Sequence, residues 1–204
     1  QTFEPDKEPP TASGFSIDLR LGTVTLTFTQ PIDAGTVTTD TAQQLTFIHD
    51  QTNPEAEKSH TLTGLDPNAD APSGLSQEVT LTFNSKDLNT IKERALCDHV
   101  HKTGKCFVKF TNGFIKDATG LSIGGVAATG AIQATGYVAD DVAPTLDKFR
   151  FDNNLGKITF EFDEPIDGNS FKPGAITLQN DEANTTGILS LALGGGTIDA
   201  GSDN

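Results

Sequence analysis

The chain of 204 residues has no Met and no Trp, a single Tyr, and half as many cationic as anionic side chains. Its 14 Lys and Arg residues against 28 Asp and Glu give a formal net charge of −14 at pH 7. A field of this sign repels phosphate, which argues against nucleic acid and anionic membrane surfaces as partners. No apolar run approaches the roughly 20 residues that cross a bilayer, so we predict no membrane insertion. Because the chain starts at Gln1 and not at Met, we expect it to be part of a longer protein.

The sequence also lacks the short motifs that carry catalysis. It has no Gly-x-Ser-x-Gly nucleophile elbow, no His-Glu-x-x-His zinc motif, and no glycine loop followed by Lys-Ser or Lys-Thr for phosphate. The glycine run at 194–196 therefore indicates a turn or a linker. We predict that the protein is not an enzyme, and the alternative is an unrecognised site at Asp98, His99 and His101.

Cysteine is scarce: Cys97 and Cys106 are the two in the chain, with eight residues between them. A turn that contains glycine separates them, so they can close one short loop in an oxidising compartment. Such a bridge stabilises a protein by roughly 2–3 kcal/mol. Free thiols and a metal site that adds His99 and His101 are the alternatives, but common zinc sites use two close ligand pairs set well apart. We predict a disulfide.

An internal repeat organises the chain. Residues 15–33 align without a gap with residues 149–167, at an offset of 134. The identical pairs are Phe15/Phe149, Asp18/Asp152, Leu21/Leu155, Gly22/Gly156, Thr25/Thr159, Phe28/Phe162, Pro31/Pro165, Ile32/Ile166 and Asp33/Asp167. Further downstream, residues 45–50 align with 176–181 once a gap of three residues is allowed. Chance does not produce a gapless match of this kind, so we infer a tandem array.

Within each copy, apolar and polar residues alternate with a period of two. The alternation covers 23–29, 79–83, 106–110 and 157–163. This pattern is typical of a strand with one face in the core and one face in water.

One segment, 85–96, has the period of a helix instead. Leu88, Ile91 and Leu96 share one of its faces, and Ser85 is placed to cap its start. Short strands separated by Gly, Pro, Asn and Asp turns, with one crossover helix, predict an all-β fold built as a β-sandwich.

The boundary between repeats is also visible in the sequence. An aromatic strand end, an acidic step and a Pro-Thr restart occur at 3–11 and again at 137–145, and they indicate a short, stiff connector. We therefore expect 1–5 to be the end of a preceding repeat, 6–139 to be the first unit, and 140–204 to be the first half of a second unit.

The second unit stops before the counterparts of three segments predicted as strands in the first, 79–83, 106–110 and 132–138. A half sandwich leaves a core face exposed and strand edges unpaired. We expect either that the chain continues or that strands of a neighbouring subunit complete the fold head-to-tail.

The Pro-Thr, Phe-x-x-Asp, Leu-Gly, Pro-Ile-Asp and Leu-Thr elements, taken in this order, resemble the tandem Ig-like repeats of very large secreted or surface proteins. Such arrays are found in microbial adhesins and in surface proteins of protists and marine invertebrates. Segments 87–92 and 113–120 also resemble this repeat type, whereas 49–71 and 97–106 depart from it. The resemblance implies tandem Ig-like sandwiches in extracellular stalks, filaments or mastigoneme-type appendages, with copies of the chain or sister repeats as partners.

The resemblance implies two kinds of modification or ligand site. Arrays of this type often hold a hard cation where connector carboxylates meet a loop carboxylate, which here means Asp140 and Asp141 with Asp117. Ca²⁺, which takes about 6–8 oxygen ligands, is the cation expected, and a solvated acidic connector is the alternative. An extracellular location also makes Asn184, in Asn-Thr-Thr, a candidate for glycosylation.

These observations predict a non-enzymatic structural segment of an extracellular filament, appendage or stalk protein at the cell surface. The alternative is an adhesin or carbohydrate-binding module that uses the insertion at 49–71, with glycans as its partner. That insertion has no Phe, Tyr or Trp on which a sugar ring would stack. The structural role is therefore favoured.

Overall fold

The computed structural model describes residues 7–52, 58–97, 102–180 and 189–198. The chain forms two compact units, which meet between Ala143 and Pro144. The boundary predicted from the sequence lies four residues earlier, after Ala139. Each unit is described by itself below.

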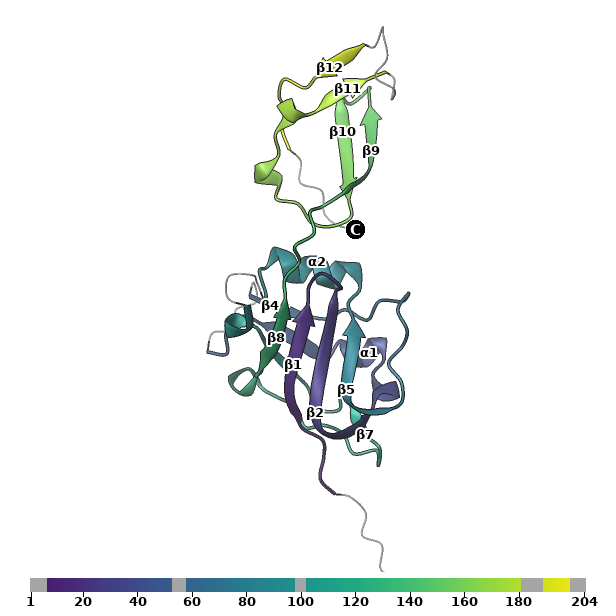
Figure 1. The fold of residues 1–204 in the computed structure, drawn as a ribbon, viewed down its shortest axis with the longest axis vertical. Coiled ribbons are helices and arrows are strands. Elements are labelled where there is room, and N and C mark those ends of the chain that lie inside the picture. Colours follow the sequence, from purple (N-terminus) through teal and green to yellow (C-terminus); the bar gives the residue numbers. More distant parts are fainter. Residues whose placement is uncertain (1–6, 53–57, 98–101, 181–188, 199–204) are drawn as a thin grey trace, which may run out of the picture. The chain divides into compact units, whose positions relative to one another are not determined.

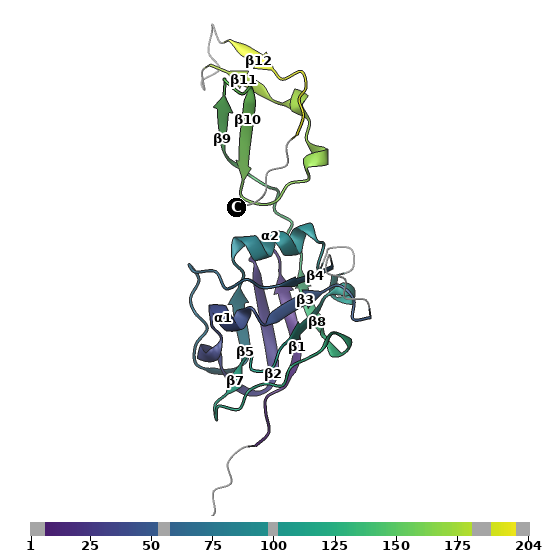
Figure 2. The same ribbon diagram turned by 180° about the vertical axis from the view of Figure 1, so that it is seen from behind.

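Unit 1 is built on one eight-stranded sheet (Figures 1 and 2). Its strands are β1 (Ala12–Asp18), β2 (Thr23–Asp33), β3 (Leu45–Ile48), β4 (Ser59–Thr61), β5 (Leu75–Thr82), β6 (Phe107–Phe110), β7 (Lys116–Asp117) and β8 (Ile132–Val138). They lie in the order β4-β3-β6-β8-β1-β2-β5, and β7 pairs with the end of β2. All pairs are antiparallel except β1 and β8, which are parallel.

This topology confirms a mainly β fold but differs from two sheets packed face to face. The parallel pairing of β1 with β8, together with the antiparallel pairing of β8 with β6, joins what would be two sheets into one curled sheet resembling half a barrel. The tandem Ig-like sandwich predicted from the sequence is therefore not what unit 1 plainly shows.

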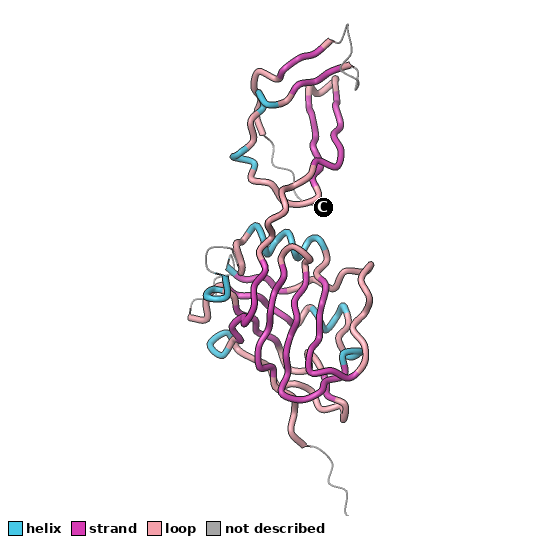
Figure 3. Tube along the Cα trace, viewed as in Figure 1, coloured by secondary structure: helices cyan, strands magenta, loops and turns pink. Residues whose placement is uncertain are grey.

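Helices are short in unit 1 (Figure 3). They are η1 (Ala34–Thr36), α1 (Thr39–Ala42), α2 (Ser85–Glu93), η3 (Lys102–Lys105) and η4 (Ala128–Gly130). The helix α2 begins where the sequence predicted, but Asn84 caps it instead of Ser85, by accepting a hydrogen bond from the backbone N–H of Asp87. It ends three residues early, because Ala95 and Cys97 adopt positive φ values of 50° and 54°. Within the described residues, no helix is long and apolar enough to cross a membrane.

The core of unit 1 lies inside the curled sheet. It takes the alternating apolar residues of the strands, and the largest fully buried side chains include Phe15, Phe47 and Phe114. The ring of Phe47 makes edge-on contacts with Phe15 and Phe83, at centroid distances of 6.1 and 5.6 Å. Burial of one such side chain contributes about 1.5–3 kcal/mol, so the core dominates the stability of unit 1.

Unit 2 consists of two separate hairpins. Its elements are β9 (Leu146–Asp152), β10 (Lys157–Phe162), η5 (Gly168–Ser170), η6 (Pro173–Ala175), β11 (Thr177–Gln179) and β12 (Ser190–Ala192). The strand β9 pairs with β10, and β11 pairs with β12, in two antiparallel two-stranded sheets.

The β9–β10 hairpin repeats the β1–β2 hairpin at the offset of 134 residues. Phe151 pairs with Ile158 as Ile17 pairs with Val24, and the register shifts at the equivalent place near the open end. The turns also match: an Asp18 carboxylate oxygen accepts hydrogen bonds from two backbone N–H groups that follow it, and Asp152 does the same. Register and turn are therefore reproduced together, although β10 ends five residues before the position equivalent to the end of β2.

The β11–β12 hairpin repeats β3–β4 at an offset of 131 residues. Leu178 pairs with Leu191 as Phe47 pairs with His60. The flanking hydrogen bond from Leu193 N–H to the Ile176 carbonyl, 2.9 Å, repeats the bond from Leu62 to Leu45 at 3.0 Å. Unit 2 thus contains counterparts of the first four strands of unit 1.

Candidate interaction surface

The two cysteines form a disulfide that joins the turn after α2 to the residue before β6. Cys97 and Cys106 are both fully buried in the core of unit 1. Because such bonds persist in oxidising compartments, this disulfide is typical of a secreted protein. Asp98, His99, His101 and Asn184 lie outside the described residues.

The carboxylate of Asp117, one of the predicted calcium ligands, is already engaged in a turn. It is buried, and one of its oxygens accepts hydrogen bonds of 2.8 Å from the Thr119 N–H, the Thr119 hydroxyl and the Leu121 N–H. Burial favours the neutral acid, but these hydrogen bonds outweigh it and hold the pKa of Asp117 below its ordinary value. The local structure alone therefore explains this buried charge.

The other two predicted calcium ligands lie elsewhere. Asp140 follows β8 and forms an ion pair with Lys92 of α2, while Asp141 is exposed. Asp117 sits beside Ile32 at one end of β2, whereas β8 ends beside the turn at the other end of β2. Figure 1 shows β7 and α2 at these opposite ends of unit 1.

The distance between the two ends excludes a shared ion within unit 1. About nine strand residues separate them, which corresponds to roughly 30 Å. Over the ranges that the structure describes, no group of three or more His, Cys, Asp or Glu side chains is placed to hold a metal. The structure does not bring the three carboxylates together.

A buried carboxylate, that of Asp87, lies in the first turn of α2. Asp87 is fully buried, with His60 Nε2 at 2.8 Å, and it accepts hydrogen bonds from the Thr63 N–H at 2.8 Å and the Asn84 side-chain amide at 3.0 Å. Burial favours the neutral acid, but the hydrogen bonds from His60 and Thr63 outweigh it and lower the pKa of Asp87. The cluster fastens the segment after β4 to α2.

The strongest contrast between the units is the exposure of equivalent core residues. Phe15 and Ile17 of β1 are 0% and 1% exposed, but their counterparts Phe149 and Phe151 of β9 are 57% and 53% exposed. Two large aromatic side chains on one face of a hairpin form an apolar patch of a kind that marks interaction sites. We call this face, with Ile158 and Phe160 of β10, the open face of unit 2.

Unit 1 shows what pairs with the two edges of the equivalent hairpin. There β8 lies along β1, where the Leu19 N–H donates to the Val138 carbonyl at 3.0 Å. On the other side β5 lies along β2, where the Phe83 N–H donates to the Gly22 carbonyl at 2.8 Å. Among residues 144–180 and 189–198, unit 2 has no strand besides β9, β10, β11 and β12.

The helix α2 covers the turn of the same hairpin in unit 1. A Cβ atom built on Gly22 would lie 3.0 Å from a methyl carbon of Leu88, which belongs to α2. A Cβ atom built on the equivalent Gly156 meets nothing within 4 Å. Strand edges, core face and turn of unit 2 are therefore uncovered in the described part of that unit.

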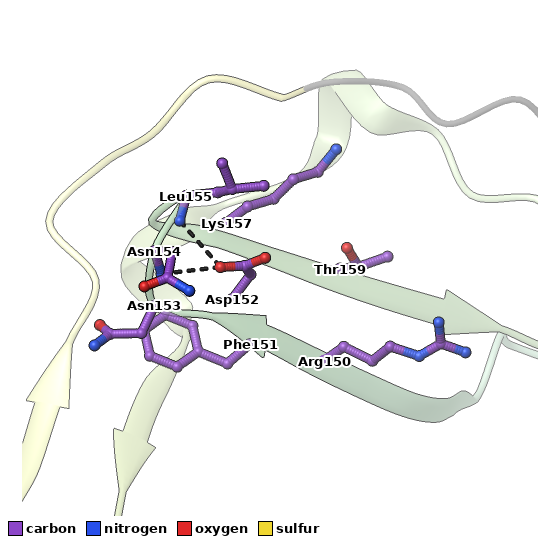
Figure 4. Close-up of a pocket in the computed structure, with 8 residues that line it drawn as sticks. All are labelled: Arg150, Phe151, Asp152, Asn153, Asn154, Leu155, Lys157 and Thr159. Atoms are coloured by element: carbon purple, nitrogen blue, oxygen red, sulfur yellow. Dashed lines mark hydrogen bonds between the residues drawn. The ribbon is translucent and has the colours of Figure 1, made fainter.

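A depression of about 560 Å³ lies at the turn end of the β9–β10 hairpin, where residues of the turn, of the polar face and Phe151 line it (Figure 4). Asp152 pairs with Lys157 across the strands, and Arg150 pairs with Thr159. Figure 4 shows an Asp152 oxygen directed at the Asn154 and Leu155 N–H groups, which it binds at 2.9 and 3.0 Å. This depression holds charges of both signs, and its carboxylate stabilises a turn, so it has no evident catalytic group.

A second depression, of about 320 Å³, lies where the insertion after β4 meets α1. Leu65, Asp66 and Asp70 of the insertion line it, together with Thr38 and Thr39. It contains no aromatic side chain. The arrangement therefore lacks the stacking platform that would favour sugar binding.

Comparison of the chain with models of known protein families, with curated proteins and with solved structures finds no match. The functional argument therefore rests on the two units of the chain and on the differences between them.

Proposed function

We propose that this protein is a non-enzymatic structural segment of an extracellular filament, appendage or stalk, built from tandem Ig-like repeats. The observation that carries the proposal is the recurrence of β1–β4 in unit 2, with the same strand pairs and the same turn. Stacked repeats of this kind make extended proteins, because each unit contacts mainly its neighbours along the chain.

The disulfide and the charge agree with an extracellular location. The disulfide between Cys97 and Cys106 suits an oxidising compartment. A formal charge of −14 keeps the chain soluble at high concentration and repels other copies sideways. Both properties suit a segment that is displayed outside the cell.

The state of the carboxylates supports a structural role. Asp87 and Asp117 accept several protein hydrogen bonds each, and Asp50 forms an ion pair of 2.6 Å with Lys105. Such carboxylates have lowered pKa values because their charged form is stabilised. A general acid needs the opposite shift, so these groups are suited to holding loops in place.

Electron microscopy of the native protein, purified from its source without proteolysis, tests this proposal. We expect linear particles with a regular axial repeat of one unit. Particles that are single and compact would overturn the proposal. The same material is applied to a glycan array to test the carbohydrate-binding alternative. That alternative predicts selective glycan binding, which the variants Asp66→Ala and Asp70→Ala would weaken.

A further inference from the structure

We propose that unit 2 binds a polypeptide segment of the kind that follows β4 in unit 1, and that this segment closes the open face of unit 2. The segment carries the pattern of residues 75–138, and the counterparts of α2, β5, β6 and β8 within it are the elements that the argument uses. This inference rests on the repeat architecture proposed above and deepens it by naming the partner that the second unit takes.

The order of strands in unit 1 defines where the partner segment would lie. In unit 1, β6 and β8 stand between β3 and β1, and β5 lies outside β2. The equivalent hairpins of unit 2 form two separate sheets. Two strands are thus needed between β11 and β9, and one strand is needed along the outer edge of β10.

The register of the outer strand follows from the pairs in unit 1. Leu26 pairs with Val79 and Val24 pairs with Leu81, so an equivalent strand would place two apolar side chains beside Phe160 and Ile158. These side chains would extend the apolar stripe of β10, as they do for β2 in unit 1.

A polar contact between β2 and β5 also has a counterpart position in unit 2. The hydroxyl groups of Thr25 and Thr80 lie 2.8 Å apart across β2 and β5. Thr159 occupies the position of Thr25 in unit 2. A hydroxyl-bearing residue on the incoming strand would therefore find a partner.

The open face differs from that of unit 1 in side-chain volume. Phe151 and Phe160 are larger than their counterparts Ile17 and Leu26, whereas Leu178 is smaller than Phe47. Because the enlargements exceed the reduction, a segment with somewhat smaller core side chains than that of unit 1 fits best, and residues 75–138 fit approximately.

Backbone chemistry identifies the partner as a polypeptide. A strand edge presents a row of N–H and C=O groups, and another strand satisfies them in register. A lipid or a small apolar ligand would cover Phe149 and Phe151 but would leave those groups without partners. Two open faces packed together would cover the rings and leave the same edges unpaired.

The test adds such a segment to the chain of 204 residues. A polypeptide of residues 72–139, oxidised to form its disulfide, is added in trans, and hydrogen exchange of residues 146–162 is followed by mass spectrometry. We expect exchange to slow at least tenfold in β9 and β10 and to stay unchanged in β1 and β2. The matched control is the same polypeptide with Val79→Ser and Leu81→Ser, which should give little protection.

A second format keeps the test decisive if the free polypeptide aggregates. The same segment, and separately its substituted form, is attached after Asn204 through a flexible Gly/Ser linker. Equal protection by both forms, or no protection by either, would overturn the proposal. Protection of 146–162 without any added segment, together with a dimeric mass, would show instead that a second copy covers the face.

The result of the exchange experiment can be distinguished from the result of the electron microscopy. A linear native particle with no effect of the added segment would retain the filament and reject strand binding. A compact native particle with segment-dependent protection would do the reverse.

Discussion

The hairpins β1–β2 and β9–β10 are two copies of one structure in different surroundings. Their residue pairs, register shift and turns coincide, yet Phe15 is buried and Phe149 is largely exposed. Pairing and turn geometry therefore depend on the hairpin itself, whereas burial depends on the rest of the core, to which β5, α2, β6 and β8 contribute. Unit 2 has no counterparts of these elements in its described part. The comparison separates what neighbouring residues determine from what distant segments supply.

The two copies also differ in how they fill space. Phe171 stands where unit 1 has Val37, and its ring lies 5.9 Å from that of Phe160. In unit 1 the comparable ring contacts come from Phe47. The aromatic side chains that fill the two units therefore come from different elements. The two cores are related, but their residues cannot be exchanged one for one.

The largest expected effect comes from truncating the same ring in both copies. Phe15→Ala should cost about 3–5 kcal/mol of unfolding free energy, because it leaves a cavity in a closed core. Phe149→Ala should cost less than about 0.5 kcal/mol in the full chain, because that side chain is exposed. Urea unfolding followed by the fluorescence of Tyr137, which is the only Tyr and lies in β8, measures Phe15→Ala in unit 1, and hydrogen exchange of residues 146–162 measures Phe149→Ala in unit 2. Equal losses would contradict the contrast between the units.

The second prediction concerns the Asp87 cluster, which unit 2 cannot reproduce because Leu191 replaces His60. Asp87→Ala should destabilise unit 1 by about 3 kcal/mol, since it leaves buried donors without an acceptor. His60→Leu, which imitates unit 2, should cost less. Urea midpoints of the two variants and the unchanged chain provide the measurement.

The same cluster predicts a dependence on pH. Because the folded pKa of Asp87 is lowered, its contribution is complete above the ordinary value of 3.8 and is lost as the pH falls toward the folded pKa. The stability of unit 1 should therefore decline below about pH 4, and less steeply in Asp87→Asn. Part of the loss of stability at low pH should remain in that variant, because the pKa of Asp117 is lowered too. A variant with an unchanged slope would show that Asp87 does not contribute.

The disulfide should give an intermediate effect that is confined to unit 1. Cys97→Ser with Cys106→Ser should lower the unfolding free energy by about 2–3 kcal/mol, because the short loop is no longer closed in the unfolded chain. Exchange in β9 and β10 should not change. A digest without reductant should contain the linked peptides, whereas two freely alkylated thiols would remove the disulfide and the argument for an oxidising compartment.

The smallest effect compares the turn glycines. Gly22 and Gly156 have φ values of 64° and 59°, so alanine at either position costs about 1 kcal/mol or slightly more. Gly22→Ala should cost more than Gly156→Ala, because its Cβ also presses on Leu88. Hydrogen exchange of the two hairpins in each variant measures both losses of stability. Identical values would mean that Leu88 of α2 moves aside without a loss of stability.

Features set by neighbouring residues could be predicted from the sequence. The alternation at 23–29 and the turn before Gly22 depend on residues within a few positions, and both hairpins form as that pattern indicates. The curled sheet could not be predicted, and a sandwich was expected in its place. The parallel pairing of β1 with β8 brings together segments that are more than one hundred residues apart in the sequence. No local pattern distinguishes such a strand from one that belongs to a second sheet.

The candidate sites show the same limit. The disulfide was predictable because its two residues lie close in the sequence and the loop between them is short. The positions of the predicted calcium ligands could not be predicted, because Asp117 and Asp140 lie at opposite ends of β2, a placement that only the strand order reveals. His60 and Asp87 are 27 positions apart, and no sequence pattern links the two.

The parallel pairing of β1 with β8 has a mechanical consequence. Because these adjacent strands run in the same direction, the chain enters unit 1 at one end of the pair and leaves it at the other. A pulling force along the chain would act in opposite directions on the two strands and slide one past the other. The hydrogen bonds between them would share that load and break together, whereas those of a hairpin pulled at its open end break one after another. Unit 1 is thus arranged to resist tension along its own axis.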